Sequence, residues 1–281
     1  MRLEKSLRQE APGEFAALSD GLCHYQLSGP VGGPAVVLIH GFSVPSFIWD
    51  QSFQPVVEAG FRTLRFDLFG RGYSDRPSAA HTHDLFVRQL AELLPAVGIQ
   101  DQVSLVGLSM GGAISAAFAL SYPELVKRLI LISPAGVMKQ SLGIRVLRLP
   151  LIGELLFLIG GEATLIKGLS QNADQLEKFD SYLRQFRRQM AFPGYKRALL
   201  SSLRGDLLCE MHETYLSLGQ RSLPSLLIWG RDDQLTHFEQ SSQIRAAMPG
   251  ISFQPLDDAG HLPHIEKSEL VNSILIQFLR T

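Results

Sequence analysis

A serine stands between two glycines in the segment Gly107-Leu108-Ser109-Met110-Gly111, which has the spacing G-x-S-x-G. An apolar run precedes this segment and a stretch of small residues follows it, so we expect a tight turn from a strand into a helix. Only small residues fit beside the serine in such a turn, which lifts the Ser109 hydroxyl off the edge of the sheet. The Met110 N–H then lies at a helix N-terminus, where it can stabilise an oxyanion. Ser109 is therefore the candidate nucleophile.

A serine hydroxyl needs a base that takes its proton, so one of the eight histidines should lie near Ser109. His261 is the candidate base, because its loop lies between the last predicted strand and the final predicted helix. His264 is the nearest rival, and we assign it a packing or loop-fixing role. The other candidates lie in segments interpreted as peripheral, as a polar connection or as a turn: His24, His212, His81, His83 and His237.

The imidazole of the base needs an acid that holds its tautomer and its orientation. Asp232 and Asp233 follow a predicted strand that ends at Gly230. One of the two carboxylates should face His261, while the other remains a solvated turn residue. Serine, aspartate and histidine then follow one another along the chain in the order that is typical of one architecture of serine hydrolases.

A second oxyanion donor is expected in His40-Gly41-Phe42, which ends the first buried strand. The glycine permits a turn in which the Phe42 N–H could join that of Met110. We interpret His40 itself as a buried histidine that fixes this loop through hydrogen bonds, and not as a catalytic group. The pattern as a whole predicts acyl transfer by a serine nucleophile.

The elements that must position these residues alternate between strands and helices. Continuous apolar runs predict strands buried on both faces of a parallel sheet, and apolar residues at helical spacing predict helices between them. The class is α/β, with a mostly parallel sheet flanked by helices. We expect strands over 35–40, 61–67, 103–107, 129–133, 226–230 and 252–256, and helices over 84–97, 112–121, 174–190, 207–218 and 270–279.

A helical insertion interrupts this alternation, since residues 137–219 contain no good strand. We therefore divide the chain into a first core part (1–136), the insertion (137–219) and a second core part (220–281). The insertion leaves the sheet at the edge that carries the candidate residues and should lie over Ser109. Its apolar side chains are expected to contact the substrate, and the ones we single out are Leu155, Phe157 and Leu158.

Composition excludes several classes of protein. The chain has 281 residues, of which 46% are hydrophobic and 19% are charged, and this is typical of a folded α/β domain. A net charge of −1 argues against a nucleic-acid partner. Two distant cysteines, the lack of a secretory leader and the lack of a membrane-spanning run predict a soluble, cytoplasmic protein. The acidic and histidine residues are too scattered for the spacing of metal ligands, so we expect no metal. The sequence contains no phosphate-binding or dinucleotide-binding motif, so we expect no cofactor.

Five segments in the same order resemble the α/β-hydrolase superfamily, and the resemblance covers nearly the whole chain. They are His40-Gly41-Phe42, the run Asp67-Leu68-Phe69-Gly70-Arg71-Gly72-Tyr73-Ser74-Asp75 (similar to D-x-x-G-x-G-x-S), the turn at Ser109, Gly230-Arg231-Asp232-Asp233, and Gly260-His261. The resemblance implies the α/β-hydrolase fold, with the insertion as a cap over the active site. It also selects Asp233 over Asp232 as the acid, and Phe42 and Met110 as the oxyanion donors.

The same resemblance narrows the expected reaction. A serine nucleophile is unlike the aspartate of haloalkane dehalogenases and soluble epoxide hydrolases, and no H-G-G-G run of the hormone-sensitive-lipase type is present. We expect a carboxylesterase or monoacylglycerol-lipase-like enzyme that cleaves small-molecule esters with small or medium acyl or aromatic groups. The alternatives are a carbon–carbon bond hydrolase of aromatic ring-fission products, a cofactor-free perhydrolase, and a ligand receptor that carries the triad with negligible turnover.

Overall fold

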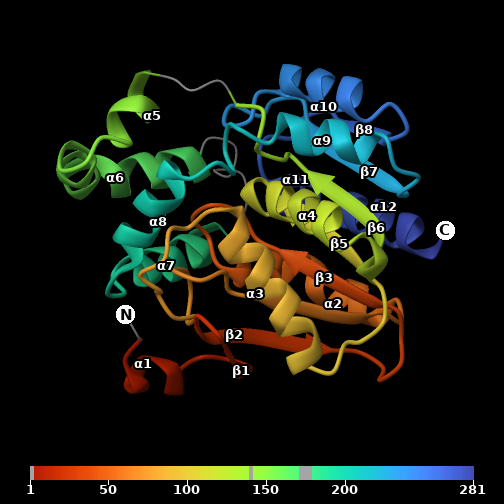
Figure 1. The fold of residues 1–281 in the computed structure, drawn as a ribbon, viewed down its shortest axis with the longest axis horizontal. Coiled ribbons are helices and arrows are strands. Elements are labelled where there is room, and N and C mark those ends of the chain that lie inside the picture. The colour runs from red at the N-terminus through yellow and green to blue at the C-terminus, as the bar shows by residue number, and fades with distance from the viewer. Residues whose placement is uncertain (1–2, 139–141, 171–178) are drawn as a thin grey trace.

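A single sheet forms the centre of the molecule (Figure 1). The computed structural model describes residues 3–138, 142–170 and 179–281. Within these residues the sheet has eight strands in the order β1-β2-β4-β3-β5-β6-β7-β8. Their bounds are β1 Glu14–Leu18, β2 Gly21–Ser28, β3 Ala35–Ile39, β4 Arg62–Phe66, β5 Val103–Leu108, β6 Val126–Ile132, β7 Ser225–Gly230 and β8 Ser252–Leu256.

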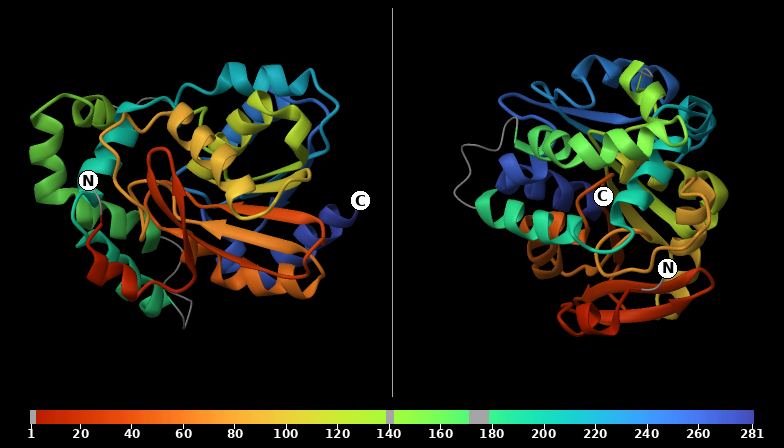
Figure 2. Two further views of the ribbon diagram at one scale, coloured as in Figure 1. Left: turned by 60° about the horizontal axis from the view of Figure 1, so that its bottom comes forward. Right: turned by 90° about the vertical axis from the view of Figure 1, so that its left-hand side faces the viewer.

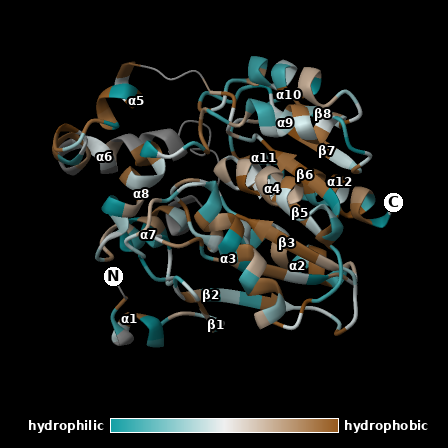
Figure 3. Cartoon of the chain, in the orientation of Figure 1, coloured by the Kyte–Doolittle hydropathy of each residue, from teal (hydrophilic) through white to brown (hydrophobic). Residues whose placement is uncertain are grey.

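Strands β3 to β8 pair in parallel with their neighbours. At the other end of the sheet, β2 pairs antiparallel with both β1 and β4. Val37 and Ile39 of β3 join one hydrophobic cluster, while Val36 and Leu38 join the cluster on the opposite face of the sheet. A strand with apolar contacts on both faces has no polar positions, which explains its continuous apolar run. Figure 3 shows hydrophobic residues concentrated in these central strands. The predicted mostly parallel sheet is confirmed.

Helices cover both faces of the sheet (Figure 1). One cluster packs α3 (His83–Ala96), α4 (Met110–Ser121), α9 (His212–Gly219) and α10 (Ser241–Ala247) against the strands. The opposite cluster packs α2 (Asp50–Glu58), α12 (Ser268–Arg280) and the short turns η1 (Ser46–Trp49) and α11 (Pro263–Glu266). Among the described residues, no helix combines the length and the apolar composition that a membrane span requires.

A third group of helices lies beyond one end of the sheet (Figures 1 and 2). It consists of α5 (Leu142–Leu147), α6 (Ile152–Ser170), α7 (Phe179–Met190) and α8 (Tyr195–Arg204). Arg204 of α8 pairs with Glu154 of α6 at 2.7 Å, which ties two of these helices together. The last helix of the predicted insertion, α9, instead packs beside α4 and α10 on the sheet domain.

The structure also contains elements that the sequence pattern did not predict. Strands β1 and β2 form an antiparallel edge whose residues are mostly half-buried, so neither strand carries a continuous apolar run. A short helix, α1 (Lys5–Gln9), precedes them. The predicted helix 174–190 is α7 from Phe179 onward, whereas residues 174–178 lie outside the described part of the chain. Tertiary pairing, and not local periodicity, therefore defines the first part of the sheet.

Candidate active site

Ser109 occupies the turn between β5 and α4 with a φ of 54° and a ψ of −119°. This conformation is costly for a residue with a side chain and occurs mainly where surrounding structure imposes it. The neighbouring glycines make the turn sterically feasible. A Cβ on Gly107 would lie 2.3 Å from the Gly111 carbonyl oxygen, and one on Gly111 would lie 2.2 Å from the Ile39 carbonyl oxygen. The strand, turn and helix predicted around Ser109 are thus present.

Asp233 and His261 meet at the carboxyl ends of β7 and β8. The His261 Nδ1 lies 2.9 Å from Asp233 Oδ2. Oδ1 of the same carboxylate accepts hydrogen bonds from the Leu235 and Thr236 amides, each at 2.9 Å. These bonds hold the carboxylate in one orientation, and the contact with His261 directs the Nδ1 edge of the ring toward it. Asp232, by contrast, is exposed.

The charge of Asp233 is stabilised although its side chain is buried, with 2% of the residue exposed. Burial alone would raise the pKa of this carboxyl, but the charge and the hydrogen bond of His261, together with the bonds from Thr236 and Leu235, lower its pKa below the usual value. The acid therefore stays ionised at neutral pH. An ionised carboxylate at Nδ1 leaves Nε2 of His261 to accept a proton.

Thr236 is a residue at this site that the sequence analysis missed. Its hydroxyl donates to Asp233 Oδ2 at 2.8 Å, and its oxygen lies 3.2 Å from His261 Nδ1. A threonine three residues after an aspartate is a common turn pattern. That pattern could have drawn attention to Thr236 as a residue that orients the acid.

Ser109 and His261 both line a cavity of about 220 Å³. Ser43 and Thr236 are the other polar residues among those that line it, and the rest are apolar or glycine. They come from the end of β5, from the loops after β3, β7 and β8, from η1 and from the predicted insertion. The lining residues are Gly41, Phe42, Ser43, Val44, Ile48, Leu108, Ser109, Met138, Leu165, Leu208, Leu235, Thr236, His261 and Leu262.

The predicted oxyanion donors lie next to this cavity. Phe42 lines it, and Met110 begins α4 directly after Ser109. The loop before Phe42 passes close to the nucleophile, because a Cβ on Gly41 would lie 3.3 Å from the Ser109 Cβ. Neither the Phe42 nor the Met110 N–H donates to a backbone carbonyl of the described residues. Both amides thus remain available to a ligand.

His40 and His264 make contacts that hold the fold together. His40 is buried, its Nδ1 donates to the Gly41 carbonyl at 2.9 Å, and its Nε2 accepts from the Leu68 amide at 2.9 Å. Burial lowers the pKa of His40 to about 4, so its ring is neutral. His264 lies against Trp49, with ring centroids 4.7 Å apart, and burial lowers its pKa to about 3. Neither histidine lines the cavity.

One histidine interpretation was wrong. His24 is not peripheral but lies buried in β2, where Nδ1 is 2.7 Å from Asp67 Oδ2. His81 lies in the connection before α3, as predicted, but its side chain is buried. Asp67 further accepts from the Ser46 and Tyr73 amides, each at 2.9 Å, so the segment 67–75 is a structural loop.

Two of the three residues expected to form the cavity wall do not line it. Leu155 is 59% exposed, and Phe157 is buried in a cluster with Tyr182, away from the cavity lining. The side chain of Leu158 lies outside what the structure describes. Among the described side chains of α6, Leu165 lines the cavity.

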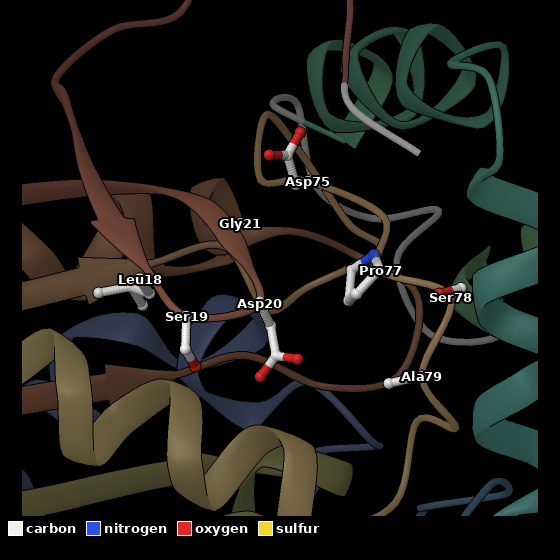
Figure 4. Close-up of a pocket in the computed structure, with 8 residues that line it drawn as sticks. All are labelled: Leu18, Ser19, Asp20, Gly21, Asp75, Pro77, Ser78 and Ala79. Carbon is white, nitrogen blue, oxygen red and sulfur yellow. The ribbon is translucent and has the colours of Figure 1, made fainter.

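A larger hollow, of about 420 Å³, lies beside the β1–β2 turn (Figure 4). Its two carboxylates are both engaged. Asp75 accepts from the Leu3 and Leu22 amides and pairs with Arg8, and Asp20 pairs with Arg88 at 2.7 Å. Within the described ranges, no three His, Cys, Asp or Glu side chains converge as metal ligands would. The cavity at Ser109 is therefore the candidate site.

Comparisons with known proteins identify the family and the fold. A model of the alpha/beta hydrolase family matches residues 36–274. A 2-hydroxy-6-oxononadienedioate/2-hydroxy-6-oxononatrienedioate hydrolase of Burkholderia vietnamiensis is 30% identical and covers 92% of this chain and 90% of its own. An uncharacterised protein of Mycobacterium tuberculosis is 28% identical over 89% of this chain and 76% of its own. The crystal structure of the enol-lactonase from Burkholderia xenovorans LB400 superposes with a TM-score of 0.81 at 22% identity, covering 95% of this chain and 100% of the enol-lactonase.

Proposed function

Because the chain belongs to the alpha/beta hydrolase family, we propose that it is a serine hydrolase in which Ser109 is the nucleophile, His261 the general base and Asp233 the acid. The observation that carries this proposal is the 2.9 Å contact between His261 and Asp233 beside the cavity that both Ser109 and His261 line. We also propose that residues 137–219 include a cap over this cavity, since Leu165 of α6 contributes to its wall.

The proposed reaction begins when Ser109 attacks a carbonyl carbon while His261 Nε2 takes the hydroxyl proton. The resulting oxyanion is stabilised by the Phe42 and Met110 amides, and loss of one such donor typically costs about 3–4 kcal/mol of transition-state stabilisation. His261 then protonates the leaving group, and the acyl group stays on Ser109. Water, activated by the same imidazole, releases the acid and restores the serine.

A carbon–carbon bond is the first candidate for the bond cleaved. The relative from Burkholderia vietnamiensis is named as a hydrolase of 2-hydroxy-6-oxononadienedioate, a name that denotes a ketone and not an ester. This finding favours the alternative of the sequence analysis over its leading expectation of an ester. In such a reaction His261 would deliver its proton to the leaving carbon, because the departing fragment is an enolate.

A carboxylic ester with an apolar acyl group is the second candidate, and the cavity lining favours it. The described lining residues include no lysine, arginine or carboxylate. A dicarboxylate would lose hydration there without gaining an opposite charge, and burying an unpaired charge is costly. A neutral ester meets no such penalty. Both candidates use the same three residues in the same roles.

Parallel assays of the wild type and Ser109→Ala test the proposal. One assay uses p-nitrophenyl esters from two to eight acyl carbons, and the other uses an aryl 6-oxo dienoate. Faster Ser109-dependent turnover of the ketone identifies a carbon–carbon hydrolase, and faster turnover of the esters identifies an esterase. Turnover of neither substrate above the Ser109→Ala background, with no labelling by a fluorophosphonate, would overturn the proposal in favour of a ligand receptor.

A further inference from the structure

Three successive carbonyls of the loop after β3 each accept a hydrogen bond from a buried side chain. The Gly41 carbonyl accepts from His40 Nδ1 at 2.9 Å. The Phe42 carbonyl accepts from Arg71 Nε at 2.9 Å, and the Ser43 carbonyl accepts from the Tyr195 hydroxyl at 2.7 Å. This run of carbonyls includes the peptide unit whose N–H is the proposed oxyanion donor, because the Gly41 carbonyl and the Phe42 N–H belong to one amide.

Arg71 is a fully buried guanidinium that makes three hydrogen bonds to neutral groups. Besides Phe42, its NH groups donate to the Phe69 carbonyl at 3.2 Å and to the Ser202 hydroxyl of α8 at 2.8 Å. The guanidinium carbon lies 5.6 Å from the centroids of the Phe42 and Phe86 rings. Burial lowers the pKa of Arg71 to about 9, so the group is still a cation at neutral pH. It occupies the space between the loop and α8.

Tyr195 reaches the same loop from the predicted cap. It is the first residue of α8, and its side chain is buried. Among the described side chains of α8, it is the one that donates a hydrogen bond to residues 40–44. Burial raises the pKa of Tyr195, and the neighbouring Arg71 and Arg76 charges oppose that rise. The hydroxyl therefore stays protonated and remains a donor. Helix α8 thus contacts the loop directly through Tyr195 and indirectly through Ser202 and Arg71.

We propose that Arg71 and Tyr195 are positioning residues that fix the Phe42 amide toward the oxyanion and make its placement depend on the docking of α8. This inference rests on the proposed function. Rotation of the Gly41–Phe42 amide would need the next two peptide units to move, and the Arg71 and Tyr195 bonds oppose that motion. A preorganised donor contributes more to the transition state than one that must reorient. Neither side chain lines the cavity, so substrate affinity should not depend on them.

The experiment compares Tyr195→Phe, Arg71→Met and Arg71→Lys with a matched control, Tyr215→Phe. Tyr215 is also a buried tyrosine whose hydroxyl donates to a backbone carbonyl, but that carbonyl belongs to Ala135, at 2.6 Å, and not to the loop after β3. Each variant is measured for kcat, KM, thermal midpoint and the rate of labelling of Ser109 by a fluorophosphonate. The labelling rate does not depend on which substrate is natural.

We expect kcat and the labelling rate to fall about tenfold in Tyr195→Phe and about a hundredfold in Arg71→Met, with KM unchanged. Misplacing an oxyanion donor should cost part of the rate that deleting the donor would cost. Arg71→Lys should recover part of the Arg71→Met loss, since an ammonium keeps the charge but not the planar fork. Tyr215→Phe should keep the wild-type kcat although it also loses a buried hydrogen bond.

Two results separate this inference from the proposed function. A wild type that fluorophosphonate does not label at Ser109 would overturn both. A labelled wild type with folded Tyr195 and Arg71 variants that match Tyr215→Phe in kcat and labelling rate would overturn the inference alone, as would a change confined to KM. If Arg71→Met does not fold, Tyr195→Phe decides the matter, because it removes a single hydroxyl.

Discussion

Ser109 combines a strained backbone with the proposed nucleophile. A φ of 54° in a residue with a side chain costs on the order of 1–3 kcal/mol, and the cost is imposed by the close contacts of Gly107 and Gly111. Ser109→Ala should abolish hydrolysis and fluorophosphonate labelling while the fold is retained. Ser109→Gly should also be inactive, but more stable than Ser109→Ala by about 1 kcal/mol, because glycine adopts this conformation freely. Denaturant unfolding of both variants measures the difference in stability. Fluorophosphonate labelling that persists in either variant would contradict the assignment of Ser109 as the nucleophile.

The acid of the site should be Asp233 and not its neighbour. Asp233→Asn should lower kcat by up to about 10⁴-fold, because an amide at this position permits the wrong imidazole tautomer. Asp232→Asn is the matched control, since Asp232 is exposed and Asp233 is the aspartate that contacts His261. Its kcat should remain within about twofold of wild type. Equal losses in the two variants would show that the orienting acid lies elsewhere.

The sequence led to these residues because the chemistry constrains their neighbours. The glycines around Ser109 and the order of serine, aspartate and histidine are visible without a structure. Thr236 and Leu165 were not found, because a hydroxyl beside a carboxylate and a leucine on a helix have many other roles. Their functions depend on contacts across distant segments, which no spacing records.

At the scale of elements, the parallel strands were predictable and the antiparallel edge was not. Strands β3 and β5 are apolar throughout because they are covered on both faces. Strand β2 carries His24 and Cys23 buried among half-buried positions, so its pattern is mixed. Helix α6 shows the opposite difficulty. It is apolar on several sides, with Leu155 exposed and Phe157 buried, so its sequence does not reveal which side faces the cavity.

A second, smaller cavity should control acyl-length preference. It measures about 20 Å³, is lined by Tyr182, Leu183 and Phe186 of α7, and shares Val44, Ile48 and Leu262 with the cavity at Ser109. Val44→Ala should widen the connection and shift the preferred ester toward longer acyl chains. Each added carbon that becomes buried should raise kcat/KM about fourfold, from about 0.8 kcal/mol per methylene.

A series of p-nitrophenyl esters measures this shift, with acetate as the reference that should change little. Leu155→Ala is the control from the predicted cap, since that side chain is exposed and should leave the profile unchanged. A Val44→Ala enzyme that is less stable but keeps the wild-type acyl profile would contradict the role of Val44 as a partition. The three shared side chains would then serve packing alone.

For the molecule as a whole, buried histidines should make stability depend on mildly acidic pH. Burial lowers the pKa of His40 to about 4, and that of His81 and His264 to about 3, from an ordinary value of 6.5. Between pH 6.5 and these values the unfolded chain binds protons that the folded chain does not. The free energy of unfolding therefore falls as the pH is lowered through this window, by about 1.4 kcal/mol per pH unit for each group.

His24 has the opposite pH dependence, at higher pH. Burial lowers the pKa of His24, but the charge and hydrogen bond of Asp67 outweigh burial and raise it. The folded state therefore holds this proton more tightly than the unfolded state, so His24 adds stability at low pH and loses that contribution as the pH rises through its folded pKa. This change falls mainly above pH 6.5, so the three histidines with a lowered pKa dominate between pH 6.5 and pH 5. The net loss in the free energy of unfolding over that range should be about 4–5 kcal/mol.

Denaturant unfolding at several pH values between 6.5 and 5 tests this balance. His264→Gln should reduce the pH dependence by about one group, or about 1.4 kcal/mol per pH unit, because glutamine does not titrate and can still donate to the Ile48 carbonyl that His264 contacts at 3.2 Å. His237→Gln is the matched control, since His237 is exposed, and its slope should equal that of wild type. A free energy of unfolding that stays constant or rises as the pH is lowered would mean that these histidines become protonated inside the fold. Protonation of His40 would remove the Nε2 acceptor of the Leu68 amide, while its Nδ1–H would still donate to the Gly41 carbonyl beside the candidate site.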